Sequence, residues 1–243
     1  MVIVIGRGHS GTRAISRTLS ESGVFMGDNL NPSYDLIPAA KLYDACRVMA
    51  PYVSHNEGLS WDFSRVHRMK IPSEFKRLVR GSLASVLAHR DGPRGWKLPE
   101  TTLIFPWIAR MFPRAYFISW VRDPRDSIIG GHLTDDLSDF GVPYQAVDDV
   151  REMRAVSWKY QRENVNATPR PRRWIEVRVE DLILDQDRTL TRLEGFLGMP
   201  LARVEVRPES VGRWRQDTER HDFDFFASDL KRLGYETEGV SAG

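Results

Sequence analysis

The segment Gly6–Thr12 has the residue types of a loop that binds an anion such as a phosphate group. It contains three glycines in seven positions, follows the apolar run Val2–Ile5, and precedes residues with helical spacing that end at Gly23. A strand, a glycine-rich turn and a helix in this order direct backbone N–H groups and a helix N-terminus toward an anion. The pattern predicts an anion-binding loop; a tight turn without a ligand is the alternative.

The spacing of Gly6 and Gly11 fits the first half of the nucleotide triphosphatase loop, G-x-x-x-x-G-K-[ST]. The second half fails, because Thr12 stands where the lysine belongs and Arg13 where the metal-binding hydroxyl belongs. Kinases and ATPases need that metal ligand to neutralise charge on the transferring phosphoryl group. We therefore expect phosphate binding at this loop with no metal ion.

Two further segments carry arginines in positions suited to anion binding. Arg122 follows Ala115–Val121, the most apolar predicted strand, and ligands bind at the carboxyl ends of such central parallel strands. The alternative for Arg122 is an ion pair with Asp126. Residues 207–215, RPESVGRWR, have no periodicity and suit either an anion-clamping loop or a solvated loop.

The elements expected to position these residues alternate between strands and helices. Expected strands are Val2–Ile5, Val24–Met26, Gly95–Pro99, Ala115–Val121 and Trp174–Val179, and expected helices lie near 14–22, 37–50, 74–89, 104–111, 190–197 and 223–233. Residues 164–173 are interpreted as a surface loop, and Trp61 and Phe63 as core residues. This order predicts an α/β fold of three layers, with a central parallel sheet and a phosphate-binding strand–loop–helix at the N-terminus.

The amino-acid composition and net charge limit the classes of function that the chain can have. The chain of 243 residues, interpreted as a single domain over 1–243, is 41% hydrophobic and 28% charged, as expected of a globular protein. Its net charge of +2 does not indicate nucleic acid binding. No leader or bilayer-spanning run is visible, and the single cysteine, Cys46, fits a reducing compartment, so a cytoplasmic location is expected.

Several short motifs together resemble the sulfotransferases that use 3′-phosphoadenosine 5′-phosphosulfate (PAPS). The matching segments, in chain order, are His9–Thr12, Phe112–Ile118, Arg122–Asp126, Glu180–Leu182, Phe196–Pro200 and the group Gly212, Trp214 and Arg215. The resemblance extends from Val2 to about Tyr235. It implies in-line transfer of the sulfuryl group from PAPS to a hydroxyl or amine of a small-molecule or carbohydrate acceptor.

The resemblance also implies which residues bind the donor. They are Arg7, Gly8, His9, Ser10, Gly11, Thr12, Arg13, Arg122, Ser127, Gly130, Gly212, Arg213, Trp214 and Arg215. The chain departs from the family pattern at His9, which replaces the loop cation, and at Gly130, which replaces a serine that binds the 3′-phosphate. Ser127 or His132 could serve in place of that serine, and Arg213 and Arg215 in place of basic residues before Gly212.

For catalysis the resemblance implies a cation at the leaving phosphate oxygen and a base on the acceptor. Lys97 is the expected cation, with His9 near the sulfonate; a lysine whose stem only covers Trp96 is the alternative. Asp28 and Asp35 are candidates for the base. Glu100 is a rival candidate for that role.

Two other functions remain open: a nucleoside or sugar kinase with a degenerate loop, and a non-catalytic nucleotide-binding protein. The acceptor is not predicted, because segments 28–70 and 132–150 carry no motif.

Overall fold

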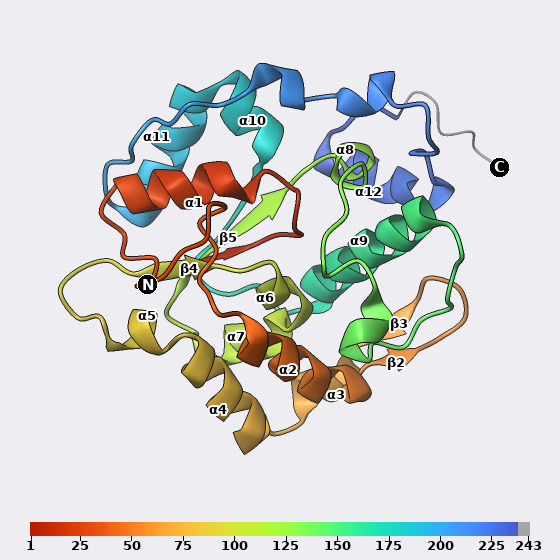
Figure 1. Ribbon diagram of the computed structural model, residues 1–243, viewed down its shortest axis with the longest axis horizontal. Helices are drawn as coiled ribbons and strands as arrows, with labels where there is room; N and C mark the ends of the chain where they lie inside the picture. Colours follow the sequence, from red (N-terminus) through yellow and green to blue (C-terminus); the bar gives the residue numbers. More distant parts are fainter. Residues whose placement is uncertain (238–243) are drawn as a thin grey trace.

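Strand β1, Val2–Ile5, is apolar at every position because both of its faces are covered. Val2 and Val4 belong to one buried cluster, with side chains of helices α1 (Thr12–Glu21) and α11 (Gln186–Leu197). Ile3 and Ile5 belong to a second cluster on the opposite face. In the computed structural model, which describes residues 1–237, these two clusters make the protein three layers thick (Figure 1).

The central sheet is parallel and has the strand order β4 (Gly95–Lys97), β1, β5 (Tyr116–Val121) and β6 (Trp174–Arg178). Val2 is in register with Gly95 on one side and Tyr116 on the other, and Phe117 is in register with Trp174. Strand β5 therefore lies between two neighbours, as its apolar sequence predicts. The predicted α/β fold with a central parallel sheet is confirmed.

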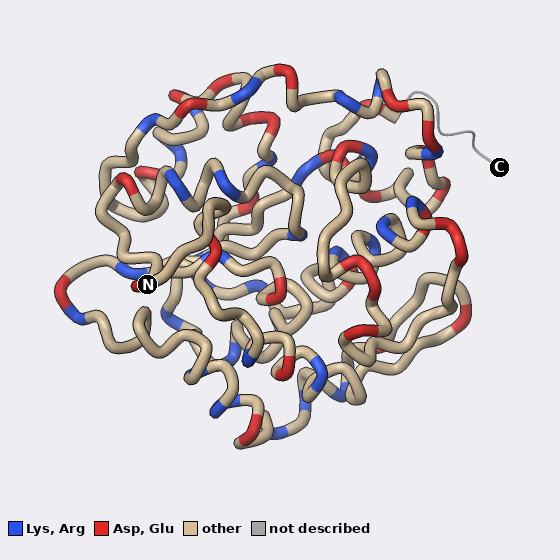
Figure 2. The backbone as a smooth tube through the Cα atoms, in the orientation of Figure 1, with Lys and Arg blue, Asp and Glu red and all other residues tan. Residues whose placement is uncertain are grey.

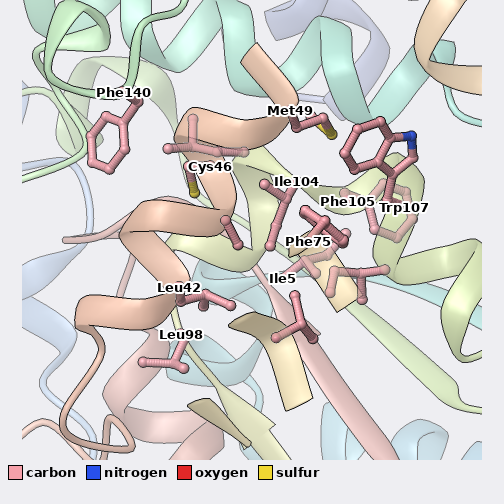
Figure 3. Packing of buried hydrophobic residues seen from close by; sticks show 14 of the residues in the cluster. Ile5, Leu42, Cys46, Met49, Phe75, Leu98, Ile104, Phe105, Trp107 and Phe140 are labelled. Carbon is pink, nitrogen blue, oxygen red and sulfur yellow. The ribbon is translucent and has the colours of Figure 1, made fainter. Parts of the chain in front are cut away.

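The larger core cluster packs under helices α2 (Ala40–Met49), α4 (Ser73–Ser82) and α7 (Phe105–Met111) (Figure 3). Phe75 packs edge-to-face on Trp107, with ring centroids 4.7 Å apart. Trp61 and Phe63 are buried in the same cluster, so their interpretation as core residues is confirmed.

Helix α9, Val150–Ala167, has no counterpart among the predicted elements. Five of its ten buried residues are polar or charged, so its buried face lacks the apolar stripe by which helices are recognised. Asn164 shows what these groups do, since its side chain donates to the carbonyls of Thr102 and Leu103 at 2.8 and 3.0 Å. The Asn164 amide thus supplies hydrogen-bond donors to carbonyl groups that have no partner inside the neighbouring helix, at its C-terminal end.

Three other sequence expectations need correction. Val24–Met26 forms only an isolated bridge between Phe25 and Arg94. The helix expected at 74–89 is two helices, α4 and α5 (Ala84–Ala88), because the chain leaves helical geometry at Leu83, with φ −99° and ψ 19°. Residues 164–167, expected in a loop, are the last turn of α9.

The remaining elements are short. They are η1 Ala50–Tyr52, β2 Ser54–His55, β3 Trp61–Asp62, α3 Ser64–Arg68, α6 Glu100–Leu103, α8 Pro124–Ser127, η2 Leu137–Phe140, α10 Val179–Leu184, η3 Pro208–Ser210, η4 Arg213–Gln216, η5 Asp224–Phe226 and α12 Ala227–Leu233. No helix within residues 1–237 is long and apolar enough to cross a membrane.

Replacing Asn164 tests whether its hydrogen bonds to α6 stabilise the packing of α9 against α6. We expect Asn164→Ala to lower the free energy of unfolding by about 2 to 3 kcal/mol, because two buried carbonyls lose their donor. Urea unfolding measures the change. Asn166→Ala, at an exposed position of the same helix, is the matched control and should cost nothing. Equal stabilities of the two variants would contradict a structural role for the Asn164 amide.

Candidate active site

A cleft of about 840 Å³ opens at the carboxyl ends of β1, β4 and β5. Its walls come from the loop after β1, the end of β4, the residue after β5, the segment 131–139 and the start of α9. Lining residues that the sequence had singled out are Gly8, His9, Gly11, Thr12, Arg13, Asp35, Lys97, Arg122 and His132. The fold thus brings residues from positions 8 to 154 into one site.

The loop between β1 and α1 has the geometry of an anion cradle. His9 and Gly11 adopt left-handed conformations, with φ 60° and 71°. Gly6 approaches β5 so closely that a Cβ atom would lie 2.7 Å from the Trp120 carbonyl oxygen. Helix α1 begins at Thr12 with no acidic residue in its first turn, and both Thr12 and Arg13 line the cleft. The helix N-terminus therefore faces the cleft without a competing carboxylate.

Arg7, which the sequence assigned to donor binding, does not line the cleft. Its guanidinium is buried, forms an ion pair with Asp135 and donates to the carbonyls of Gly8 and Ser127. Asp135 lies in the segment 131–139, so Arg7 joins the donor loop to the opposite wall of the cleft. The family resemblance assigned Arg7 to the ligand, and the sequence of a glycine-rich loop gives no sign of which way a flanking arginine side chain points.

Two histidines and two glycines fit together at the centre of the site. A Cβ atom on Gly130 would lie 2.8 Å from Nδ1 of His9, and one on Gly8 would lie 2.1 Å from Cγ of His132. The two imidazole rings meet edge-to-face, with centroids 5.9 Å apart. The His9 ring thus occupies the space beside Gly130, which explains why this position has no side chain.

Both imidazoles are neutral near pH 7. Burial lowers the pKa of His9, and it lowers the pKa of His132 to about 4, with the nearby Arg7 charge acting in the same direction. The backbone N–H of Thr134 donates to Nδ1 of His132 at 3.1 Å, which leaves the proton of the neutral ring on Nε2. His9 therefore does not supply the positive charge expected at this loop position.

Lys97 and Asp35 form a buried ion pair on the wall of the cleft. The Lys97 side chain is 3% exposed and the Asp35 side chain 17% exposed, and the lysine also donates to the Ser33 carbonyl at 3.0 Å. Burial lowers the pKa of Lys97, and Asp35 partly restores it. Asn31 accepts from the Asp35 backbone N–H at 2.9 Å, which fixes the loop that carries the carboxylate.

The other two candidate bases do not reach the cleft. Asp28 is exposed, and its backbone N–H contacts Ser85 at 3.4 Å, on the side of α5. Glu100 is buried beside Tyr43, and burial raises its pKa. Of the three carboxylates considered, only Asp35 lines the cleft, next to the candidate cation.

Arg122 links three segments at the end of β5. It donates to the His9 carbonyl at 3.0 Å, contacts the Ser210 carbonyl, and lies 3.4 Å from Asp126. The ion pair considered from the sequence is therefore present, and Arg122 also lines the cleft. A guanidinium has five N–H groups, so donors remain for an anion after these contacts.

The predicted donor residues near the C-terminus lie beside Arg122 but do not line the cleft. Asp126 accepts from the backbone N–H groups of Gly212 and Trp214 at 2.8 and 2.9 Å, and the Arg125 guanidinium lies 3.8 Å from the Trp214 ring centre. Arg213 and Arg215 are exposed.

Two predicted serines are likewise absent from the lining of the cleft. Ser127 is fully buried, and its hydroxyl has no hydrogen-bond partner within residues 1–237. Ser10 is buried, and its carbonyl accepts from the Trp120 side chain at 2.9 Å. Neither residue therefore lines the cleft in this structure.

The residues on the far wall of the cleft were not predicted from the sequence. It comprises Leu133, Asp135, Asp136, Asp139, Val150, Met153 and Arg154. The one available signal was Asp149, whose side chain accepts from the Glu152 backbone N–H at 2.7 Å and begins α9. An Asp three residues before a Glu is typical of a helix N-terminus.

The buried neutral His132 predicts a specific loss of stability in acid. Between pH 6.5 and about 4 the unfolded chain binds a proton at this residue that the folded chain does not. The free energy of unfolding should therefore fall as the pH drops through this window, by about 3 kcal/mol at most. Urea unfolding at several pH values should show a weaker pH dependence for His132→Gln. His55→Gln, at the half-buried end of β2, is the control; an unchanged dependence in both variants would disprove the assignment.

A sequence profile of the sulfotransferase family matches residues 2–203. A search of curated protein sequences found no match.

Two solved structures resemble the whole chain. The sulfotransferase domain from the curacin biosynthetic pathway has a TM-score of 0.59 and 16% sequence identity, and the match covers 97% of this chain and 98% of that chain. The sulfotransferase domain from the Synechococcus PCC 7002 olefin synthase has a TM-score of 0.60 and 14% identity, with 97% and 94% covered. At this identity the likeness shows a shared fold, whereas the profile covers most of the chain. The chain therefore belongs to the sulfotransferase family.

Proposed function

We propose that the cleft binds PAPS and that the protein transfers its sulfuryl group to a hydroxyl or amine of an acceptor by in-line displacement. The observation that carries this proposal is the Lys97–Asp35 pair, which lines the same cleft as the loop Gly8–Arg13 and Arg122. A cation, a carboxylate and an anion cradle are the three groups that such a transfer requires.

The residues present fit an anionic donor. The N-terminus of α1 supplies backbone N–H groups and has no acidic residue in its first turn, Arg13 adds a guanidinium, and Arg122 keeps unshared donors. PAPS, when bound, supplies the activated sulfuryl group. Arg122, beside the docked segment 212–214, would hold the 3′-phosphate, and the loop around His9 would hold the phosphosulfate.

Each catalytic role falls to a residue with a fixed position. The Lys97 ammonium, held by Asp35 and the Ser33 carbonyl, would stabilise negative charge on the leaving phosphate oxygen. Asp35 would accept the proton of the acceptor hydroxyl or amine. The neutral imidazoles of His9 and His132 can donate hydrogen bonds to the sulfonate without adding charge.

The Lys97–Asp35 pair should contribute to turnover and not to donor affinity. Lys97→Ala should lower kcat by about 10²- to 10³-fold with little change in donor Kd, because a cation at the leaving group acts on the transition state. Asp35→Asn should lower kcat by about 10²-fold or more. Steady-state kinetics with a labelled donor and an acceptor found by screening would measure both.

Asp28→Asn is the matched control, since Asp28 is exposed outside the cleft, and its kcat should stay within a few-fold of the wild type. Thermal unfolding of each variant would separate lost chemistry from lost folding. Near-normal turnover in a folded Lys97→Ala protein would refute the catalytic assignment.

The altered loop predicts donor binding without metal. Because Thr12 and Arg13 replace the lysine and the metal-binding hydroxyl, 3′-phosphoadenosine 5′-phosphate should bind with the same affinity in Mg²⁺ and in EDTA. Isothermal calorimetry measures this, with ATP as the competing ligand. A requirement for Mg²⁺, or tighter binding of ATP, would instead favour a kinase. Donor binding with no transfer to any screened acceptor would favour a non-catalytic protein.

A further inference from the structure

The edge of the sheet opposite the cleft carries a row of arginines. Arg94 directly precedes β4, Arg114 lies two residues before β5, and Arg173 directly precedes β6. Because the strands are parallel, their amino ends lie at one edge, and the cleft lies at the other. The hydrogen bond from Arg173 to the Arg114 carbonyl, 2.8 Å long, places two of these residues side by side.

This row extends into an arginine surface that acidic residues do not neutralise. We define the arginine surface as Arg94, Arg110, Arg114, Arg170, Arg172 and Arg173. All except the half-buried Arg94 are exposed, and none has a carboxylate partner among residues 1–237. Segments 101–122 and 164–175, which supply five of the six, contain no Asp or Glu.

Elsewhere acidic and basic residues are interspersed along the chain (Figure 2). Some exposed arginines there pair with carboxylates, as Arg17 does with Glu21 and Arg47 with Asp44. The segments that supply the arginine surface, by contrast, contain no acidic residue that could pair with these arginines locally.

An apolar groove of about 510 Å³ lies within this surface, between α7 and the segment 168–172. Its apolar lining consists of Pro106, Ala109, Pro113, Pro169 and Pro171. Proline has no backbone N–H, so this lining offers few hydrogen-bond donors and favours apolar side chains. Arg110 and Arg172 also line the groove and place positive charge directly beside it.

Several of these arginines are held in place by the fold. Arg170 lies 4.7 Å from the Trp174 ring centre, and Arg173 lies 4.6 Å from that of Tyr116. Arg110 donates to the carbonyls of Val66 and Met69, at 3.0 and 2.8 Å. Guanidinium groups fixed in this way lose little entropy when they bind carboxylates. The stacked arginines also occupy the faces of Trp174 and Tyr116 on which nucleic acid bases would stack.

We propose that the groove and the arginine surface bind an acidic amphipathic helix of a partner protein. Apolar side chains of that helix would enter the proline-lined groove, and its Glu and Asp residues would pair with the arginines on either side. Helices bind in grooves in this way through anchors spaced three and four residues apart. A nucleic acid or a lipid surface would use the charge but leave the apolar groove without a purpose.

The experiment places a reporter in the groove. Ala109→Cys can be labelled selectively with a polarity-sensitive fluorophore, because the single native thiol, Cys46, is buried. The probe is a synthetic helical peptide with leucines along one face and glutamates along the flanks. We expect a saturable blue shift that weakens with added salt, since the carboxylate–arginine pairs are screened.

Matched variants identify the binding surface. Arg170→Ser with Arg172→Ser should weaken peptide binding by about tenfold or more, as expected for the loss of charge-assisted hydrogen bonds. Arg77→Ser, at an exposed position of α4, is the control and should bind like the wild type. A peptide with glutamines in place of the leucines should bind at least about tenfold more weakly.

Equal binding of the glutamine peptide would overturn the proposal, because charge alone would then explain the affinity. An equal loss in Arg77→Ser would do the same. Tighter binding of a DNA duplex or of phosphatidylserine vesicles than of the leucine peptide would show that the surface recognises another class of partner.

Discussion

Charges buried at the carboxyl edge of the sheet must be paired, and this constraint organises the candidate active site. Arg7 pairs with Asp135, Arg122 with Asp126, and Arg125 with Asp123, and all six side chains are at most 9% exposed. Removing one member of such a pair costs about 3 to 5 kcal/mol, since the other charge stays buried. Asp126 also binds two backbone N–H groups of the segment 212–214. The walls of the cleft are therefore tied to one another.

The two edges of the same sheet differ in how their arginines are neutralised. At the carboxyl edge Arg7, Arg122 and Arg125 are buried and paired within the chain, which leaves Arg122 only its remaining donors for a ligand. At the amino edge they are exposed and paired with carbonyls and aromatic rings instead. A buried charge requires an internal partner, whereas an exposed one is solvated by water and remains available to an outside partner.

Sequence patterns predicted the fold well where hydrophobic burial alone decides the structure. Strands β1 and β5 are apolar throughout because both faces are covered, and their prediction is confirmed. Helix α9 was missed because Arg151, Gln161, Arg162 and Asn164 replace apolar residues on its buried face. The periodicity of apolar residues indicates which face of a helix is buried. It does not reveal a helix whose buried face packs through hydrogen bonds.

For the site, local sequence patterns were enough to predict the glycine-rich loop after β1, the arginine after β5 and the family to which their order points. Each of these signals is local, set by backbone conformation and strand burial within a few residues. Long-range packing decides that Asp35, and not Asp28, meets Lys97, and that Arg7 is buried in an ion pair with Asp135 and does not line the cleft. These choices depend on contacts between residues 62 and 128 positions apart. No local pattern encodes them, because which charges share a buried space is fixed by the packing of the whole sheet.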